Sequence, residues 1–66
     1  MQITVNGNPT ALEQEATVPQ LLATLGLQDK PCAVEVNAVV VPKSAHASCT
    51  LRPGDAVEIV TLVGGG

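Results

Sequence analysis

The chain has 66 residues, so it forms one domain near the lower size at which a hydrophobic core holds a fold together without disulfides or metal ions. It has no Phe, Tyr or Trp and a formal net charge of −3, which argues against nucleic-acid binding, because single strands are gripped by aromatic stacking and duplexes by clustered Lys and Arg. A chain of this length also leaves no room for a deep catalytic pocket.

The N-terminal segment Met1–Asn6 lacks the basic and long apolar regions of a secretion signal. The most apolar stretch, Ala38–Val41, is far too short to span a bilayer, so we expect a cytoplasmic protein. Two widely spaced cysteines, Cys32 and Cys49, are too few for a zinc site, and no metal is expected. In a reducing compartment each is interpreted as a small packed apolar residue, with a redox or persulfide role as the alternative.

The first elements are two strands joined by a tight turn. Met1–Val5 alternates apolar and polar residues, which predicts a half-buried strand. Asn6 and Gly7 supply the pair of positive φ angles that a two-residue hairpin needs. A short return strand is expected around Pro9–Leu12.

A helix is predicted next. Thr17 is placed to cap it, Pro19 is tolerated in its first turn, and Gln20 completes a capping box. Gly26 is expected to end it as the first residue beyond the C-cap. The apolar stripe of this helix, spaced i, i+3, i+4 and i+7, consists of Val18, Leu21, Leu22 and Leu25.

Three more strands are predicted in the second half. Ala33–Asn37 repeats with a period of two, and Val39–Val41 follows a bend, so these segments form a second hairpin. Lys43–Ser48 shows no clear period and is expected to be a surface loop or a single helical turn. A type II turn at Pro53-Gly54 leads into the last strand.

This order of elements predicts an α+β fold with a mixed sheet of four to five strands and one main helix packed across one face. Right-handed crossover rules favour a final strand that runs parallel to the first, in the middle of the sheet. That arrangement is the β-grasp, or ubiquitin-like, fold. We expect the domain to span residues 1–63, followed by a flexible glycine tail at residues 64–66.

Alternation along the last strand predicts a docking surface. If Val57 and Ile59 face the helix, then Glu58, Val60 and Leu62 emerge on the opposite face. Exposed apolar residues rimmed by polar groups commonly mark a protein interface. Scattered surface aliphatics are also ordinary, so both interpretations stay open.

The sequence closes with Gly64, Gly65 and Gly66. Because glycine has no Cβ, such a segment can lie extended in a slot too narrow for any side chain and can bring a terminal carboxylate to the catalytic atoms of another protein. The alternative is a disordered end or an artificial linker scar.

Several segments together resemble one known family. They are the Asn6-Gly7 turn, Val34–Asn37 followed by Val41–Ser44 and His46, the turn Pro53–Asp55, and the ending Val57–Gly66. Over essentially the whole chain they look like the sulfur carrier proteins of thiamine biosynthesis, the ThiS family.

The resemblance implies a carrier that acts as a co-substrate of partner enzymes and is not itself an enzyme. In the family, an E1-like adenylyltransferase uses ATP to adenylate the terminal carboxylate. Sulfur from a cysteine desulfurase or another source then gives a thiocarboxylate, which donates its sulfur to thiazole synthase. Carried over to this chain, Gly66 bears the adenylate and the thiocarboxylate, and Gly64 and Gly65 thread into the partner active sites.

No bound cofactor is expected in this chain, because its glycines are not followed by the helix and Lys of a phosphate-cradling loop, so the ATP site belongs to the partner. No catalytic residue is expected either. His46, Ser44, Ser48 and Asp55 include the residue types of a hydrolase triad, but no motif fixes their geometry.

Other functions fit the same fold. A related carrier supplies sulfur for molybdopterin and shares the diglycine end, although its chains are typically longer and richer in aromatic and Pro residues near the end. A carrier of another sulfur pathway, a ubiquitin-like modifier and a β-grasp binding module without carrier chemistry are further alternatives.

Overall fold

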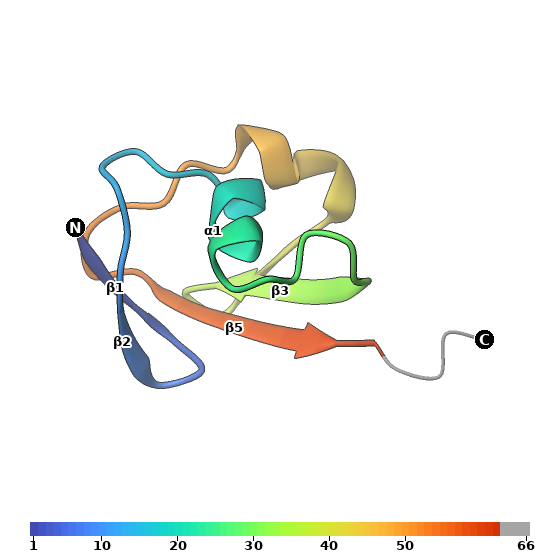
Figure 1. Ribbon diagram of the computed structural model, residues 1–66, viewed down its shortest axis with the longest axis horizontal. Coiled ribbons are helices and arrows are strands. Elements are labelled where there is room, and N and C mark those ends of the chain that lie inside the picture. The colour runs from blue at the N-terminus through green and yellow to red at the C-terminus, as the bar shows by residue number, and fades with distance from the viewer. Residues whose placement is uncertain (63–66) are drawn as a thin grey trace.

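The elements follow one another as predicted in the computed structural model, which describes residues 1–62 (Figure 1). Lys43–Ser48, for which a loop or a helical turn was expected, is a 3-10 helix. The bounds of the elements are β1 (Gln2–Val5), β2 (Asn8–Ala11), α1 (Val18–Thr24), β3 (Cys32–Val36), β4 (Val39–Val41), η1 (Lys43–Ser48) and β5 (Ala56–Thr61).

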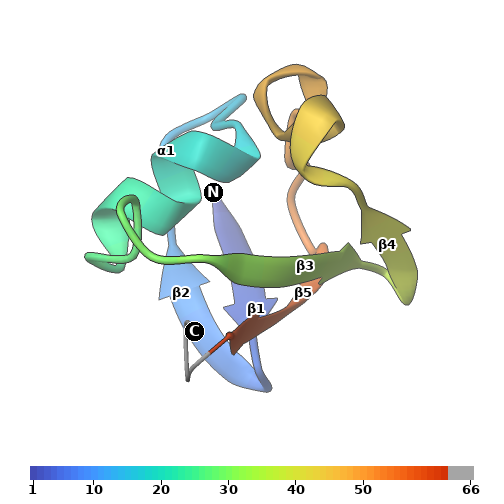
Figure 2. The same ribbon diagram turned by 90° about the vertical axis from the view of Figure 1, so that its right-hand side faces the viewer.

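The five strands form one mixed sheet in the order β2-β1-β5-β3-β4. β5 is the central strand and runs parallel to β1 on one side and antiparallel to β3 on the other. α1 and η1 lie on the same side of this sheet (Figures 1 and 2). The predicted mixed sheet with a central final strand and one main helix, the β-grasp arrangement, is confirmed.

Both hairpins turn on two residues with positive φ. In the β1–β2 hairpin, φ is 50° at Asn6 and 83° at Gly7. In the β3–β4 hairpin, φ is 51° at Asn37 and 69° at Ala38. Such angles suit the right-handed twist of antiparallel strands, but only glycine adopts them without steric cost. Ala38 therefore occupies an unfavourable conformation.

α1 is stabilised at both ends by the contacts that the sequence predicted. The Gln20 side chain accepts hydrogen bonds from the Thr17 backbone N–H at 2.8 Å and from the Thr17 hydroxyl at 3.3 Å. At the other end, Gly26 has a φ of 75°, and the Leu27 N–H donates to the Leu22 carbonyl at 2.7 Å. This is the long bond of a Schellman motif, which satisfies a carbonyl of the last turn.

The core lies between α1 and the covered face of the sheet. The predicted helix stripe is correct at three of its four positions, but Leu25, the C-cap residue beyond the last residue of the helix, is 38% exposed. Cys32 and Cys49 are free, half-buried and packed against the core, as the first of their two interpretations predicted. The buried members of the core are Ile3, Val5, Val18, Leu21, Leu22, Val34, Leu51, Val57 and Ile59.

Within residues 1–62, the structure contains no helix of the length and apolar character that crossing a bilayer requires.

Candidate functional site: the end of β5

β5 directs the chain toward its C-terminal segment. It begins after the predicted turn, where Gly54 has a φ of 85° and the Asp55 N–H donates to the Arg52 carbonyl at 3.1 Å. The Asp55 carboxylate also accepts a hydrogen bond from the Arg52 N–H at 2.9 Å, which closes the turn from within. At the far end, the Leu62 N–H donates to the Pro31 carbonyl at 2.9 Å. The strand is thus held at both ends.

The predicted tail residues Gly64, Gly65 and Gly66 lie outside the described residues, as does the last residue of the predicted domain, Val63. Their assigned roles in threading and in bearing the thiocarboxylate therefore stay predictions. The structure describes β5 and Leu62, which precede this segment in the chain.

Asn6 binds β5 with its side chain. The regular pairing of β1 with β5 ends at Val5 and Val57. Beyond it, the Ile59 N–H donates to Asn6 Oδ1 at 2.8 Å, and Asn6 Nδ2 donates to the Ile59 carbonyl at 3.1 Å. The Asn6 side chain thus makes the two hydrogen bonds to β5 that the backbone of one further β1 residue would make. The Asn-Gly pair predicted only a turn at Asn6, and because the turn fully explains the pair, no separate signal in the sequence indicated this second role.

Asn37 does the same from the other hairpin. The Ala56 N–H donates to Asn37 Oδ1 at 2.9 Å, and Asn37 Nδ2 donates to Asp55 Oδ1 at 3.0 Å. The backbone N–H of Asn37 also donates to the Ala56 carbonyl at 2.7 Å. Two asparagines from separate turns therefore fix the start and the middle of β5.

The three residues of the predicted docking surface are all exposed, but they do not form one surface. Glu58 and Val60 alternate with buried residues of β5 and so lie on the sheet face opposite α1; Val60 is 60% exposed. Leu62, which is 53% exposed, lies beyond the last residue of β5 and lines a groove together with Leu22 of α1. Docking at these residues stays a prediction, and it now concerns two neighbouring surfaces.

The open face of the sheet carries an acidic pair beside Val60. The register places Glu35 of β3 directly opposite Glu58 of β5, so the two carboxylates project from the same face. Ala33 lies opposite Val60 in the same register. The face therefore combines small apolar side chains with two adjacent negative charges.

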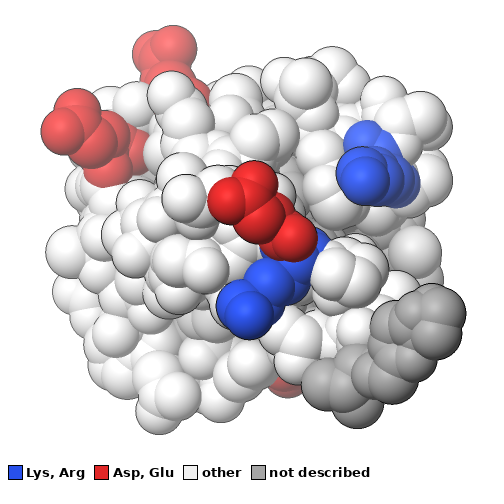
Figure 3. Space-filling view, turned by 45° about the vertical axis from the view of Figure 1, so that its right-hand side comes forward, with Lys and Arg blue, Asp and Glu red and all other residues white. Residues whose placement is uncertain are grey.

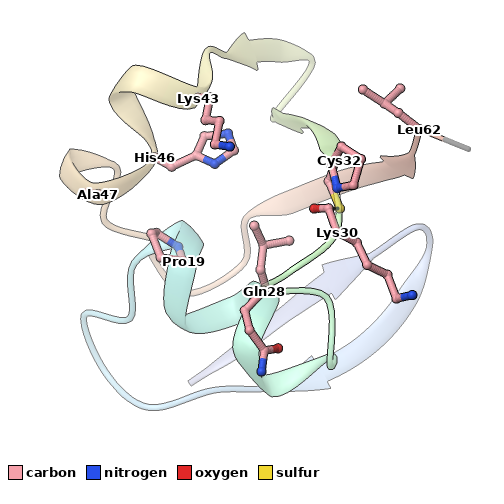
Figure 4. A pocket seen from close by; sticks show the side chains of 10 residues that line it. Pro19, Gln28, Lys30, Cys32, Lys43, His46, Ala47 and Leu62 are labelled. Carbon is pink, nitrogen blue, oxygen red and sulfur yellow. Dashed lines mark hydrogen bonds between the residues drawn. The ribbon is translucent and has the colours of Figure 1, made fainter. Parts of the chain in front are cut away.

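A groove of about 490 Å³ opens between α1, η1 and the start of β3 (Figure 4). Its lining includes Lys30 and Lys43, two of the three cationic side chains of the chain, and Leu62, the residue after β5. The Cys32 thiol in its wall donates to the Lys30 carbonyl at 3.4 Å. The lining residues are Pro19, Leu22, Gln28, Lys30, Pro31, Cys32, Lys43, His46, Ala47 and Leu62.

The residue types of a hydrolase triad serve separate parts of the fold. His46, only 8% exposed, has its Nε2 3.1 Å from the Val41 carbonyl. The Ser48 hydroxyl donates to the Ala45 carbonyl at 3.1 Å, and the Asp55 carboxylate bonds within its own turn and to Asn37. These side chains therefore make structural bonds and are not linked to one another.

Residues 1–62 contain no group of three or more His, Cys, Asp or Glu side chains that could hold a metal ion. The face shown in Figure 3 is largely uncharged, with a few Lys or Arg and Asp or Glu side chains; near its centre an acidic and a basic side chain lie side by side. We take the end of β5 and the surfaces around it, which precede the glycine segment in the chain, as the candidate site.

Comparison with solved structures reveals close neighbours. The crystal structure of a thiamine biosynthesis protein (ThiS) from Geobacter metallireducens is 36% identical, matches with a TM-score of 0.84 and covers all of both chains. An NMR solution structure of a thiamine biosynthesis protein from the same organism is 36% identical, with a TM-score of 0.80; the match covers all of this chain and 88% of that one.

Curated relatives match over all 66 residues. Thiazole synthases from Paramagnetospirillum magneticum and Magnetococcus marinus are 39% and 36% identical, and this chain spans only 20% of the length of each. The protein ycf40 of Porphyra purpurea is 32% identical, and this chain spans 93% of its length. The model of the ThiS family matches residues 3–66. With the fold and the sequence in agreement, the chain belongs to the ThiS family, and its fold is ubiquitin-like.

Proposed function

We propose that the chain is a sulfur carrier whose Gly66 carboxylate is converted to a thiocarboxylate and used as the sulfur donor for the thiazole moiety of thiamine. The observation that supports this most strongly is the match to the ThiS family across residues 3–66, a span that includes the glycine segment. Two relatives named thiazole synthase contain a segment similar to this chain, which supports the choice of thiazole formation over other sulfur pathways.

The proposed chemistry explains why partner enzymes are needed. An α-carboxyl group has a pKa of about 3.5 and is a resonance-stabilised anion at neutral pH, which nucleophiles do not attack. In the proposed reaction, a carboxylate oxygen of Gly66 attacks the α-phosphorus of ATP on an E1-like adenylyltransferase, and pyrophosphate leaves. The persulfide that a cysteine desulfurase forms on a cysteine then attacks the acyl carbon, AMP leaves with the bonding electrons, and a thiol reduces the resulting acyl disulfide and releases the thiocarboxylate.

The folded domain has a positioning role in this proposal. β5 donates hydrogen bonds to the side-chain oxygens of Asn6 and Asn37, and the Leu62 N–H that follows it donates to the Pro31 carbonyl, so the segment after Leu62 starts from a defined point. Gly64 and Gly65 thread into the active site of the adenylyltransferase and later of thiazole synthase, because they carry no side chain. We place all of these steps in the cytoplasm, and the carrier itself holds neither ATP nor metal.

The test is a loading reaction followed by intact-mass measurement. The chain is incubated with ATP, the adenylyltransferase and a sulfur source, and the expected product has one oxygen replaced by sulfur at Gly66. A reaction without ATP and a Gly65→Val variant are the controls, and both should keep the original mass. The proposal is contradicted if the parent chain keeps its mass while the Geobacter metallireducens ThiS, treated in parallel, is loaded.

The loaded chain then assigns the pathway. It is offered separately to thiazole synthase and to molybdopterin synthase, and loss of the sulfur is followed by mass. We expect sulfur transfer only with thiazole synthase, and transfer only to molybdopterin synthase would reassign the carrier.

A further inference from the structure

The two edges of β5 are covered to different extents. On the β3 side, pairing continues from Val36 and Val57 to Cys32 and Thr61. On the β1 side, regular pairing covers only the first part of the strand and ends at Val57. Figure 1 shows β5 running on past the β1–β2 hairpin toward the end of the chain. The second half of β5 therefore has one neighbouring strand instead of two.

The hydrogen-bond pattern identifies the peptide groups that face this uncovered edge. Along the β1 side, the Val57 carbonyl accepts from the Asn6 N–H at 2.8 Å, and both peptide groups of Ile59 are occupied by the Asn6 side chain. Because strand residues alternate in the direction of their peptide groups, the next residue to face this side is Thr61.

The register on the β3 side agrees with this direction. The Leu62 N–H bonds to Pro31, so residues 62 and 31 form a hydrogen-bonded pair, and the adjacent pair of Thr61 and Cys32 is of the kind that exchanges no hydrogen bonds. The N–H and C=O of Thr61 thus point away from β3, to a side where residues 1–62 provide no strand beyond Asn6.

We propose that this half-edge of β5, centred on the Thr61 peptide groups, receives an extended backbone segment of the adenylyltransferase, which adds a strand in line with β1. The choice of the adenylyltransferase rests on the proposed function. A sheet edge offers alternating backbone donors and acceptors, and another extended chain is the partner that matches them.

Two observations favour the enzyme as the occupant of the half-edge. In the sequence, Thr61 stands two residues before the segment 63–66 that is proposed to enter that enzyme, so pairing at Thr61 would hold the enzyme next to the segment it acts on. The side chains that flank Thr61, Val60 and Leu62, are 60% and 53% exposed and offer apolar contacts on either side of an added strand.

A second copy of this chain fits the half-edge less well. Two copies repel each other, because each has a formal net charge of −3.

The first measurement is amide hydrogen exchange by NMR on the free chain and on its complex with the adenylyltransferase. The Thr61 amide should exchange rapidly in the free chain and at least about tenfold more slowly in the complex, because it gains an acceptor. The Val60 amide, which faces β3, serves as the internal control and should be protected in both states.

The second measurement removes the donor without changing the side chain. Cys49 allows native ligation of a synthetic peptide of residues 49–66 to residues 1–48, so a full chain with N-methylated Thr61 is accessible. Its melting temperature should equal that of the unmethylated ligated chain. Its affinity for the adenylyltransferase should fall about tenfold or more, because the Thr61 donor is lost and the added methyl group obstructs the incoming strand. N-methylation of Val60, the matched control, should lower the melting temperature.

Several results would overturn the half-edge proposal. These are unchanged affinity after N-methylation of Thr61, a Thr61 amide that stays unprotected in the saturated complex, protection that arises with chain concentration in the absence of enzyme, or no binding to the enzyme. Failure of the carrier proposal gives a different pattern, in which the chain binds and the Thr61 effects appear but sulfur is not loaded.

Discussion

Asn6 and Asn37 occupy equivalent positions in the two hairpins and have nearly the same backbone angle, with φ at 50° and 51°. Each uses its amide oxygen to accept a hydrogen bond from a backbone N–H of β5, Asn6 from Ile59 and Asn37 from Ala56. Asparagine suits both tasks, since it tolerates positive φ and carries a donor and an acceptor on a short side chain. The turns were predictable from the sequence, but the bonds to a distant strand were not.

Replacing Asn6 by Gly separates its role in the turn from its hydrogen bonds to β5. Gly keeps the freedom to adopt positive φ but removes both bonds to Ile59, so the free energy of unfolding should fall by about 1–3 kcal/mol. Asn6→Asp retains only the acceptor and should give an intermediate loss. Urea unfolding measures both variants, and a Gly variant as stable as the parent would show that the two bonds do not stabilise the fold.

Two exchanges between Gly and Ala should change stability in opposite directions. Ala38 has a φ of 69°, so Ala38→Gly relieves steric strain and should stabilise the chain by up to about 1 kcal/mol. At Gly26, with a φ of 75°, an added Cβ meets nothing within 4 Å. Gly26→Ala should therefore destabilise through backbone strain alone, by about 1 kcal/mol. Thermal unfolding of both variants is the measurement, and changes of the same sign would refute this account.

At the scale of elements, the apolar spacing of α1 predicts burial correctly within the helix but not beyond its end. Its apolar spacing continues to Leu25, but the helix ends at Thr24. Gly26 marked the end of the helix, and the Schellman bond confirms it. How far the sheet extends beneath the last turn depends on strands elsewhere in the chain, so the exposure of Leu25 could not be predicted from the local pattern.

The difference between Leu21 and Leu25 can be measured directly. Leu21 is fully buried, so Leu21→Ala leaves a cavity in the core and should reduce the free energy of unfolding by about 2–5 kcal/mol. Leu25→Ala, the matched control on the same helix, should reduce it by less than about 1 kcal/mol, because its side chain is partly exposed. Equal losses in chemical denaturation would show that Leu25 belongs to the core after all.

In β5, too, the structural element ends before the sequence pattern does. Alternation grouped Glu58, Val60 and Leu62 on one face, and the exposure of all three is confirmed. The strand ends at Thr61, however, and Leu62 lines the groove on the helix side. The groove itself is built from elements that are far apart in the sequence, so no local pattern indicated it.

Charge substitutions test whether the two surfaces at the end of β5 take part in docking. Val60→Glu and Leu62→Glu should each weaken binding to the adenylyltransferase about tenfold, equivalent to about 1.4 kcal/mol, without unfolding the domain. Val39, which is 67% exposed on β4, provides the control Val39→Glu, for which affinity should not change. Titration calorimetry measures all three, and unchanged affinity of the Val60 and Leu62 variants would remove the docking hypothesis.

At the scale of the whole molecule, the predictions that rested on general rules were the most successful. The right-handed crossover rule was enough to place the last strand beside the first, and the register confirms it at Thr4 with Ala56 and Val5 with Val57. The candidate site was only partly predictable. Composition and resemblance indicated the glycine tail, but the half-edge at Thr61 follows from the point at which Asn6 ends the β1–β5 pairing, which only the assembled sheet shows.

The most direct measurement of the central claim compares the full chain with a variant that lacks Gly65 and Gly66, in a bacterial strain whose own ThiS carrier is deleted. Both forms should show the same unfolding transition in vitro, because the core of the domain lies within residues 1–62. We predict that the full chain restores thiazole formation and that the shortened chain restores none. Thiazole formation supported by the shortened chain would contradict the account.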